Sequence, residues 1–254
     1  MFINQMPEAP EKSVCETHGE YEHSYQRLGE KFIVMNNCSK CAELAEADRQ
    51  AEEKKQKLLA EEKFYTDRKL NAGISRRHIE CSFSNYKAVS HEQKKALQQV
   101  SDYSDALFGE TSACLVMAGS VGTGKTHLAS AVANRFIESG KKCMVIKMSE
   151  LIRSIKDTWR KDSDTSEAKI MDKLSKVGLL IIDEIGIQFG SDTEKLLISE
   201  IIDNRYQNLL PTVLISNLDL SGIKSCIGER SYDRLREDGG KVVAFNWDSH
   251  RGAK

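Results

Sequence analysis

A glycine-rich segment in the middle of the chain carries the residue types that phosphate chemistry requires. Residues 119–126 read GSVGTGKT and match the pattern G-x-x-x-x-G-K-[ST] at every fixed position. Small residues let backbone N–H groups approach phosphate oxygens, and a helix N-terminus adds partial positive charge. Lys125 would bind the β- and γ-phosphates, and the Thr126 hydroxyl would bind Mg²⁺. The predicted nucleotide-binding residues are Gly119, Ser120, Val121, Gly122, Thr123, Gly124, Lys125 and Thr126.

The surroundings of this segment favour a ligand site over a plain glycine turn. An apolar run at 113–118 precedes it and a helix-like run at 126–138 follows it. A further apolar run at 179–182 ends in Asp183 and Glu184. In a nucleotide hydrolase, Asp183 would bind Mg²⁺ directly or through water, and Glu184 would be the general base. A strand with an acidic end is common by itself, but its combination with the upstream loop predicts nucleotide hydrolysis.

Three further polar residues follow in the C-terminal part of the chain. Asn217 follows the apolar run 212–216, where it serves either as an ordinary turn residue or as a contact to the γ-phosphate or the attacking water. Arg230 and Arg234 are four apart, so they share one helix face. They form either surface ion pairs or an arginine finger, a guanidinium that a neighbouring subunit supplies to a transferring phosphoryl group.

Two pairs of metal-ligand residues lie near the N-terminus. Cys15-x-x-His18 and Cys38-x-x-Cys41 are separated by nineteen residues. Two close pairs across a loop are the usual way to build a tetrahedral structural Zn²⁺ site. A segment this short cannot bury a core, so the metal would supply its folding free energy. His23 is an alternative ligand to His18, and free surface thiols are the alternative to a site.

A candidate for contacts with single-stranded DNA lies between the second and third predicted strands of the C-terminal region. Lys156, Trp159 and Arg160 interleave cations with an aromatic side chain. The cations would contact phosphates while Trp159 stacks on a base. The alternative is a helix that buries Trp159 against the core.

The order of predicted elements separates three regions. Residues 1–41 form the zinc-binding head, and residues 42–80 a charged helical linker that either is solvated or binds a partner protein. Residues 81–254 alternate apolar strands with helices, which predicts an α/β domain whose mostly parallel sheet is covered on both faces. The expected strands are 113–118, 143–148, 178–182, 212–216 and 241–245, and the expected helices are 126–138, 150–160, 167–176 and 193–208.

Composition limits the classes of partner. The 254 residues carry a net charge of −1, so nucleic-acid contacts must come from a local patch. No apolar run approaches the roughly 20 residues of a membrane helix. The polar N-terminus lacks a signal-peptide core, and the seven cysteines form no regular disulfide framework. We therefore expect a cytoplasmic protein without membrane partners.

Taken together, the motifs resemble those of the DnaC/IstB branch of AAA+ ATPases, on the side of the DnaC-type helicase loaders. The resemblance extends from about Cys81 to the end of the chain and rests on four stretches. They are GTGKTHLA at 122–129, IDEIG at 182–186, GER at 228–230 with Asp233-Arg234, and FNWDS at 245–249. The N-terminal third does not resemble that of the best-known DnaC-type loader, which favours a phage or prophage version of such a loader.

The resemblance implies a fold and a set of roles. The fold would be a P-loop AAA+ three-layer sandwich without the usual C-terminal lid, preceded by the head and helix. Asn217 would be the sensor I residue, Arg234 the arginine finger with Arg230 as the alternative, and Arg251 the sensor II residue. An aromatic side chain at the position of Trp159 lines the DNA channel in the family.

The resemblance also implies partners and an activity. Subunits would assemble into a spiral or ring and load the replicative helicase onto single-stranded DNA. ATP with Mg²⁺ would act mainly as a slow switch. That the head and helix engage the helicase is a separate hypothesis, which rests on their position outside the ATPase core. Two alternatives stay open: an IstB-type transposition helper ATPase, which acts with a transposase on duplex DNA, and a nucleotide-binding adaptor with negligible turnover.

Overall fold

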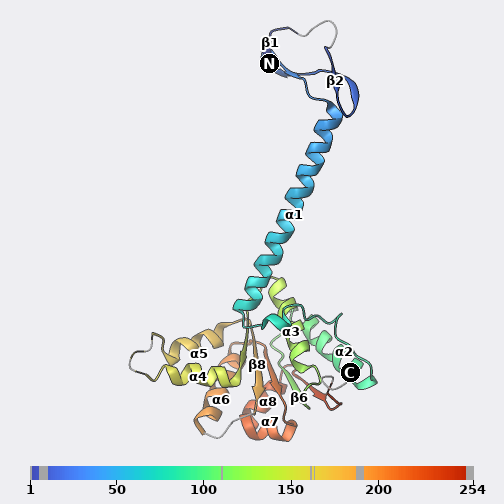
Figure 1. Ribbon diagram of the computed structural model, residues 1–254. Coiled ribbons are helices and arrows are strands. Elements are labelled where there is room, and N and C mark those ends of the chain that lie inside the picture. The colour runs from blue at the N-terminus through green and yellow to red at the C-terminus, as the bar shows by residue number, and fades with distance from the viewer. Residues whose placement is uncertain are drawn as a thin grey trace. The chain divides into compact units, whose positions relative to one another are not determined.

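The computed structural model describes residues 2–5, 11–109, 111–160, 162, 164–186 and 192–249, with side chains described from residue 195 in the last range. The chain divides into two compact units, an N-terminal unit (Met1–Lys63) and a second unit (Phe64–Lys254). Figure 1 labels their helices and strands, and each unit is described by itself.

The N-terminal unit contains short antiparallel strands that the sequence analysis did not predict. Its strands are β1 (Phe2–Ile3), β2 (Lys12–Cys15), β3 (Gly19–Glu22), β4 (Ser24–Leu28) and β5 (Lys31–Met35). Strands β2 and β3 form one hairpin, while β5 pairs with both β1 and β4. Among the described residues of this unit, Cys38 alone is buried. These strands therefore have no hydrophobic core to stabilise them.

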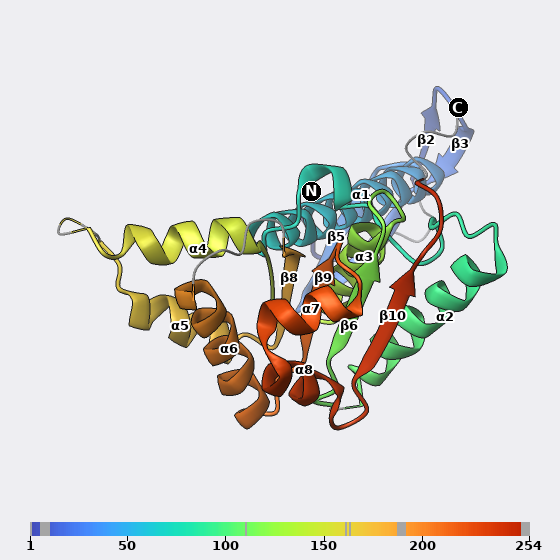
Figure 2. The same ribbon diagram turned by 90° about the horizontal axis from the view of Figure 1, so that it is seen from below.

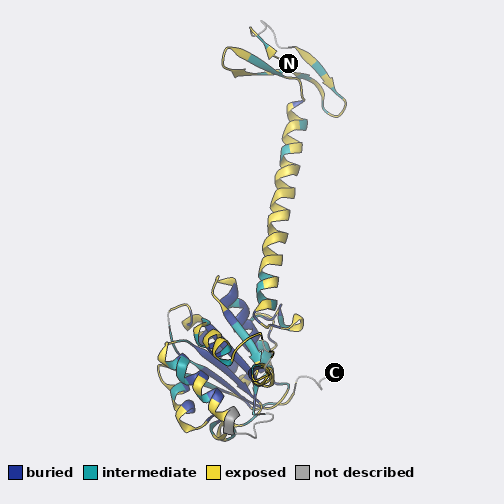
Figure 3. Ribbon diagram, turned by 90° about the vertical axis from the view of Figure 1, so that its left-hand side faces the viewer, coloured by how far each residue is buried: buried dark blue, intermediate teal, exposed yellow. Residues whose placement is uncertain are grey.

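Helix α1 (Ser39–Asn71) confirms the charged helix expected from residue 42 onward. The helix lacks glycine and proline and is rich in alanine, glutamate and lysine, which are strong helix formers. It contains no buried residue, and Figure 3 shows its surface as largely exposed. Gly73 follows with a φ of +92°, the left-handed conformation typical of a helix end. No described helix is both long and apolar enough to cross a bilayer.

The second unit is built on a five-stranded sheet in which every pair of neighbouring strands is parallel. Its order is β10-β6-β9-β8-β7. The strands are β6 (Leu115–Gly119), β7 (Cys143–Lys147), β8 (Leu179–Ile185), β9 (Thr212–Ser216) and β10 (Lys241–Phe245), so all five predicted strands are present. In a parallel sheet the carboxyl ends of the strands share one edge, where ligands bind. The glycine-rich loop, the paired acids and Asn217 all follow or end strands at that edge.

Helices cover both faces of this sheet, which confirms the predicted three-layer arrangement. Alternate strand residues divide between two hydrophobic clusters, with Met117 and Ile181 in one and Val116 and Leu180 in the other. One face packs against α2 (His91–Ala106) and α3 (Lys125–Glu138). The other packs against α4 (Met148–Asp157), α5 (Glu167–Lys176), α6 (Asp192–Gln207), α7 (Leu220–Ile227) and α8 (Glu229–Arg236). Figure 2 shows α2 beside β10, with α4, α5 and α6 on the other side of the unit.

Helix α2 was missed by the sequence analysis although its start carries a recognisable signal. The Ser90 side chain accepts a hydrogen bond from the Gln93 backbone, and the Gln93 side chain accepts one from the Ser90 backbone. This reciprocal pair is a capping box, which stabilises the first turn of a helix.

Arg205 joins two strands of the sheet from inside the core. The side chain is fully buried and donates hydrogen bonds to the carbonyls of Leu174, Val177 and Pro211 and to the Thr212 hydroxyl. Burial lowers the pKa of Arg205 to about 10. These bonds tie the residues before β8 to the start of β9, so Arg205 helps to set the order of the two strands that end at the site.

Candidate nucleotide and metal sites

The glycine-rich loop joins β6 to α3 in a conformation that only glycine adopts without strain. Gly122 and Gly124 have φ values of +79° and +94°. A Cβ atom on Gly122 would lie 2.0 Å from the Ser249 Oγ atom, and one on Gly124 would lie 2.5 Å from the ring of Tyr86. The residues around the loop therefore require glycine at both positions.

A cavity of about 390 Å³ lies along this loop. The loop residues from Val121 to Thr126, both paired acids and Asn217 line it, as the sequence analysis expected. Arg77, His78 and Cys81 also line it. They lie before the first strand of the sheet, and no motif in the sequence pointed to them. The cavity thus brings together segments from four separate parts of the chain.

Lys125 is buried within the loop that it is expected to serve. Its Nζ atom donates hydrogen bonds to the carbonyls of Gly119 at 2.8 Å and Ser120 at 2.6 Å. Burial lowers the pKa of Lys125 to about 8, an effect that the charge of Asp183 opposes. A triphosphate would offer this ammonium group charged oxygen acceptors in place of neutral carbonyls.

The side chains of Thr126 and Asp183 lie close enough to bind the same metal ion. The Thr126 hydroxyl donates to an oxygen of the Asp183 carboxylate at 3.0 Å, although the two residues are 57 positions apart. Burial raises the pKa of Asp183, while hydrogen bonds from the Glu184 backbone and the Thr126 hydroxyl oppose that shift. A hard divalent cation prefers oxygen ligands of this kind, so the residues fit Mg²⁺.

Glu184 is held by a lysine that the sequence analysis did not identify. Its Oε1 atom accepts a hydrogen bond from the Nζ atom of Lys147 at 2.8 Å. Lys147 ends β7, where it lies in register with Asp183 on β8. The hydrogen bond with Glu184 raises the pKa of Lys147. Pairing with Lys147 occupies an oxygen that a general base would offer to water. The signal available in the sequence was the position of Lys147 at a strand end.

The two arginines of α8 differ in their surroundings. Arg234 forms an ion pair with Asp203 of α6, its guanidinium lies 5.1 Å from the centre of the Tyr206 ring, and its side chain is 13% exposed. Arg230 is 76% exposed, and its Nη2 atom lies 3.9 Å from Asp203. The ion-pair alternative is therefore present within this chain, with Asp203 as the partner. Arg251 lies outside the described residues.

Trp159 is 56% exposed, so the alternative that buries it against the core is wrong. Its indole N–H donates to Glu167 at 2.9 Å, and Arg160 lies 3.8 Å from Asp157. Lys156 is exposed on the last turn of α4. The predicted DNA contacts are thus accessible, although acidic groups accompany them.

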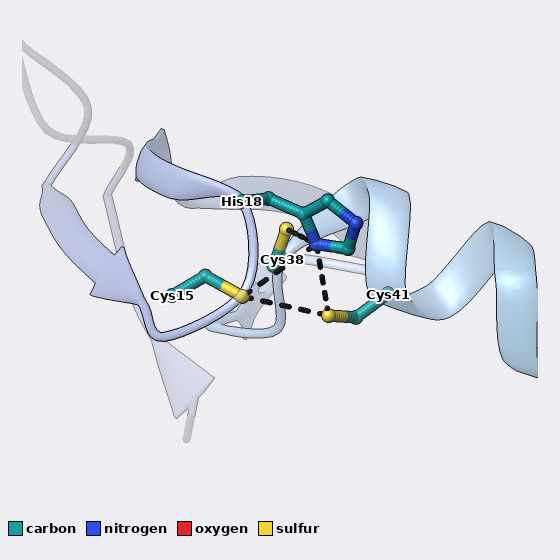
Figure 4. A group of neighbouring side chains, drawn as sticks. All are labelled: Cys15, His18, Cys38 and Cys41. Atoms are coloured by element: carbon teal, nitrogen blue, oxygen red, sulfur yellow. Dashed lines mark hydrogen bonds between the residues drawn. The ribbon is translucent and has the colours of Figure 1, made fainter.

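The four predicted zinc ligands gather at one place in the N-terminal unit, as Figure 4 shows. Cys41 Sγ lies 3.5 Å from Cys15 Sγ and 3.2 Å from the Nδ1 atom of His18. Cys15 and Cys38 each place their sulfur 3.7 Å from the same nitrogen. Tetrahedral zinc with ordinary bond lengths separates two sulfur ligands by about 3.8 Å and a sulfur and a nitrogen ligand by about 3.6 Å. The spacing and the donor set therefore fit Zn²⁺.

Local hydrogen bonds shift the pKa values of two thiols of this cluster in opposite directions. Backbone N–H groups of Thr17 and His18 lower the pKa of Cys15 to about 6. The hydrogen bond with Cys15 raises the pKa of Cys41 to about 11. His23 is not part of the cluster, because its ring contacts Ser13 at 2.7 Å and Glu11 at 3.5 Å. His18 is the histidine that joins the three cysteines.

Comparison with known proteins identifies a family that matches this chain. The family of IstB-like ATP binding proteins matches residues 31–251. The replicative helicase loader DnaC of Buchnera aphidicola subsp. Baizongia pistaciae is 38% identical over 180 residues, which cover 71% of this chain and 73% of that protein. The replicative helicase loader DnaC of Escherichia coli strain K12 has the same identity and coverage.

Solved structures show the same fold. The crystal structure of a DnaC helicase loader matches with a TM-score of 0.59 and 24% identity, and the match covers 67% of this chain and 99% of that chain. The predicted P-loop AAA+ fold is thereby confirmed. The chain therefore belongs to the family of IstB-like ATP binding proteins, within which it is similar to the DnaC replicative helicase loaders.

Proposed function

We propose that this chain is an ATP-dependent loader of a replicative DNA helicase. The observation that carries the proposal is the contact between Thr126 and Asp183 in a cavity that Lys125 and Glu184 also line. It occurs in a chain whose relatives are named replicative helicase loaders. The phosphates of ATP would lie along the loop, and Mg²⁺ held by Thr126 and Asp183 would neutralise charge that develops on the transferring group.

Slow, switch-like hydrolysis is part of the proposal. Glu184 would accept a proton from the attacking water, and Asn217 would contact the γ-phosphate. The ion pair between Glu184 and Lys147 supports slow turnover, because the lysine occupies one of the two carboxylate oxygens that could accept a proton from water. ATP occupancy, rather than rapid turnover, would then govern the state of the protein.

Assembly of several subunits into a spiral or ring would bring an arginine of one chain to the ATP of the next. Arg234 is the proposed finger, and it would exchange Asp203 for the γ-phosphate of a neighbour. The exposed residues Lys156, Trp159 and Arg160 would contact single-stranded DNA. The head, with Zn²⁺ held by Cys15, His18, Cys38 and Cys41, and helix α1 would bind the helicase.

The loader proposal predicts a specific protein partner and a specific DNA. With ATP and Mg²⁺, the immobilised full chain should retain the replicative helicase from a bacterial lysate, as identified by mass spectrometry. The same protein should bind a single-stranded oligonucleotide more tightly than the matching duplex in a fluorescence anisotropy titration. Trp159→Ala should weaken the single-strand affinity by about tenfold, because stacking on one base is worth about 1–3 kcal/mol.

Lys125→Ala is the control that links this behaviour to ATP. It should remove the ATP dependence of both measurements, since the loop loses its only phosphate-binding ammonium group. Retention of a transposase together with preference for duplex DNA would support the IstB-type alternative and contradict the loader proposal.

The arginine assignment predicts complementation between two inactive variants. Arg234→Ala should lower ATP hydrolysis by about 10³-fold, the usual effect of removing an arginine finger. Mixing it with Glu184→Gln should restore hydrolysis, because one chain supplies the arginine and the other supplies the base. Phosphate release measured across mixing ratios would show this.

Arg230→Ala is the matched variant on the same helix face. It should keep most of the hydrolysis rate by itself. The Glu184→Gln chain can restore hydrolysis only if the Arg234→Ala chain is folded. Restoration would therefore show that Arg234→Ala did not lose its activity by unfolding. If Arg230→Ala is inactive and is restored by Glu184→Gln while Arg234→Ala is not, Arg230 is the finger instead.

A further inference from the structure

The backbone carbonyl of Thr123 accepts two hydrogen bonds from aromatic side chains. The Tyr86 hydroxyl donates to it at 3.0 Å, and the Trp247 indole N–H donates to it at 3.1 Å. Tyr86 precedes the first strand of the sheet, whereas Trp247 follows the last one. Residues 37 positions before and 124 positions after Thr123 therefore meet at one atom.

This arrangement fixes the orientation of one peptide group of the loop. The described backbone has no cis peptide bond, and in a trans peptide the C=O and the following N–H point in opposite directions. Two donors on the Thr123 carbonyl satisfy both of its lone pairs. The N–H of Gly124 must then point away from the two donor atoms, and Gly124 lines the cavity in which the phosphates are expected.

Neighbouring contacts hold both aromatic donors in place. The ring of Tyr86 packs against Gly124 so closely that a Cβ atom there would clash at 2.5 Å, and it stacks edge-to-face on His127 at 5.4 Å. The ring of Trp247 lies 4.9 Å from that of Phe245. Thr123 itself is fully buried, and its hydroxyl donates to the carbonyl of Ser120 at 2.8 Å.

The end of β10 and the chain that follows it also touch the loop at two other points. The Ser120 N–H donates to the carbonyl of Phe245 at 3.0 Å, and Ser249 fills the space beside Gly122. The residues from Phe245 to Ser249 therefore follow the outer side of the loop. A change in the position of the loop on ATP binding would change the surroundings of Trp247.

We propose that Tyr86 and Trp247 are positioning residues, which hold the Thr123–Gly124 peptide so that the Gly124 N–H donates to a phosphate oxygen of ATP. Neither residue touches the phosphate itself. The inference rests on the proposed ATP binding and adds the groups that prepare the loop for it. It also makes Trp247 a reporter of whether the loop is occupied.

The test compares ATP affinity with stability in single-atom and ring variants of the full chain. Tyr86→Phe removes only the hydroxyl oxygen, and Trp247→Phe removes the indole N–H. Each should weaken ATP·Mg²⁺ binding by about fivefold in calorimetry, the effect of one hydrogen bond, and the double variant should weaken it further. The melting temperature without nucleotide should stay close to that of the wild type for Tyr86→Phe.

Trp159→Phe is the background for the fluorescence measurement, because it removes the other tryptophan of the chain, which is exposed and bonded to Glu167. Trp247 is then the sole tryptophan emitter. Addition of ATP should then change the intensity or wavelength of its emission. A purely structural role for Trp247 would not produce that signal.

The outcomes separate this inference from the function on which it rests. Absence of ATP binding by the wild type would contradict the proposed function. If the wild type binds ATP and Tyr86→Phe, Trp247→Phe and the double variant all bind it with the same affinity, the positioning role alone is overturned. Unchanged Trp247 emission on saturation with ATP would overturn the claim that Trp247 reports whether the loop is occupied.

Discussion

Glu184→Gln should lower the rate of ATP hydrolysis by about 10²–10⁴-fold while leaving ATP affinity nearly unchanged. A positioned general base contributes a factor of that size, and glutamine keeps the shape of the side chain but cannot accept the proton. Lys125, Thr126 and Asp183, which would bind the phosphates and Mg²⁺, stay intact in this variant. Phosphate release under saturating ATP gives the rate, and calorimetry gives the affinity.

Glu150→Gln is the control for the loss of a negative charge near Lys147. Glu150 is exposed on α4. Its negative charge, like that of Glu184, raises the pKa of Lys147. It should hydrolyse ATP at the wild-type rate. Equal rates for the wild type and Glu184→Gln would show that Glu184 is not the base. Absence of hydrolysis in both, with ATP bound, would support the adaptor alternative.

Cys38→Ser should abolish zinc binding and unfold the N-terminal strands. Structural Zn²⁺ sites contribute about 10–16 kcal/mol of apparent binding free energy near neutral pH, and the described strands of this unit have no hydrophobic core to replace it. Metal analysis of the purified chain should fall from one zinc to well below one. ATP affinity should be unchanged, because the cavity is lined by residues of the second unit only.

The two histidines of the head provide the matched control for this result. His18→Ala should lose zinc as Cys38→Ser does, whereas His23→Ala should keep it, because His23 contacts Ser13 and Glu11 rather than the cysteines. Full zinc content in Cys38→Ser would contradict the proposed site. Loss of zinc in His23→Ala with retention in His18→Ala would reverse the ligand assignment.

The spacing of ligand residues could be predicted from the sequence because it is local. Each motif depends only on neighbours in the chain: the glycine loop before a helix, the two acids at the end of an apolar run, and the two pairs of metal-ligand residues. The alternation of strands and helices likewise predicted a parallel sheet with helices on both faces. The choice between His18 and His23 required the β2–β3 hairpin, whose turn places His18 next to Cys15.

The sequence by itself determined which groups could bind a triphosphate and a metal, since short motifs encode their type and local geometry. Only the tertiary structure decided what holds those groups in place. Strand β9 lies between β6 and β8, which places Asn217 at the cavity, and strand order depends on packing over the whole sheet. Three sets of contacts join distant segments: the ion pair of Lys147 with Glu184, the ion pair of Asp203 with Arg234, and the hydrogen bonds from Tyr86 and Trp247 to Thr123. No periodicity or spacing encodes such contacts, because they arise when separate elements pack against one another.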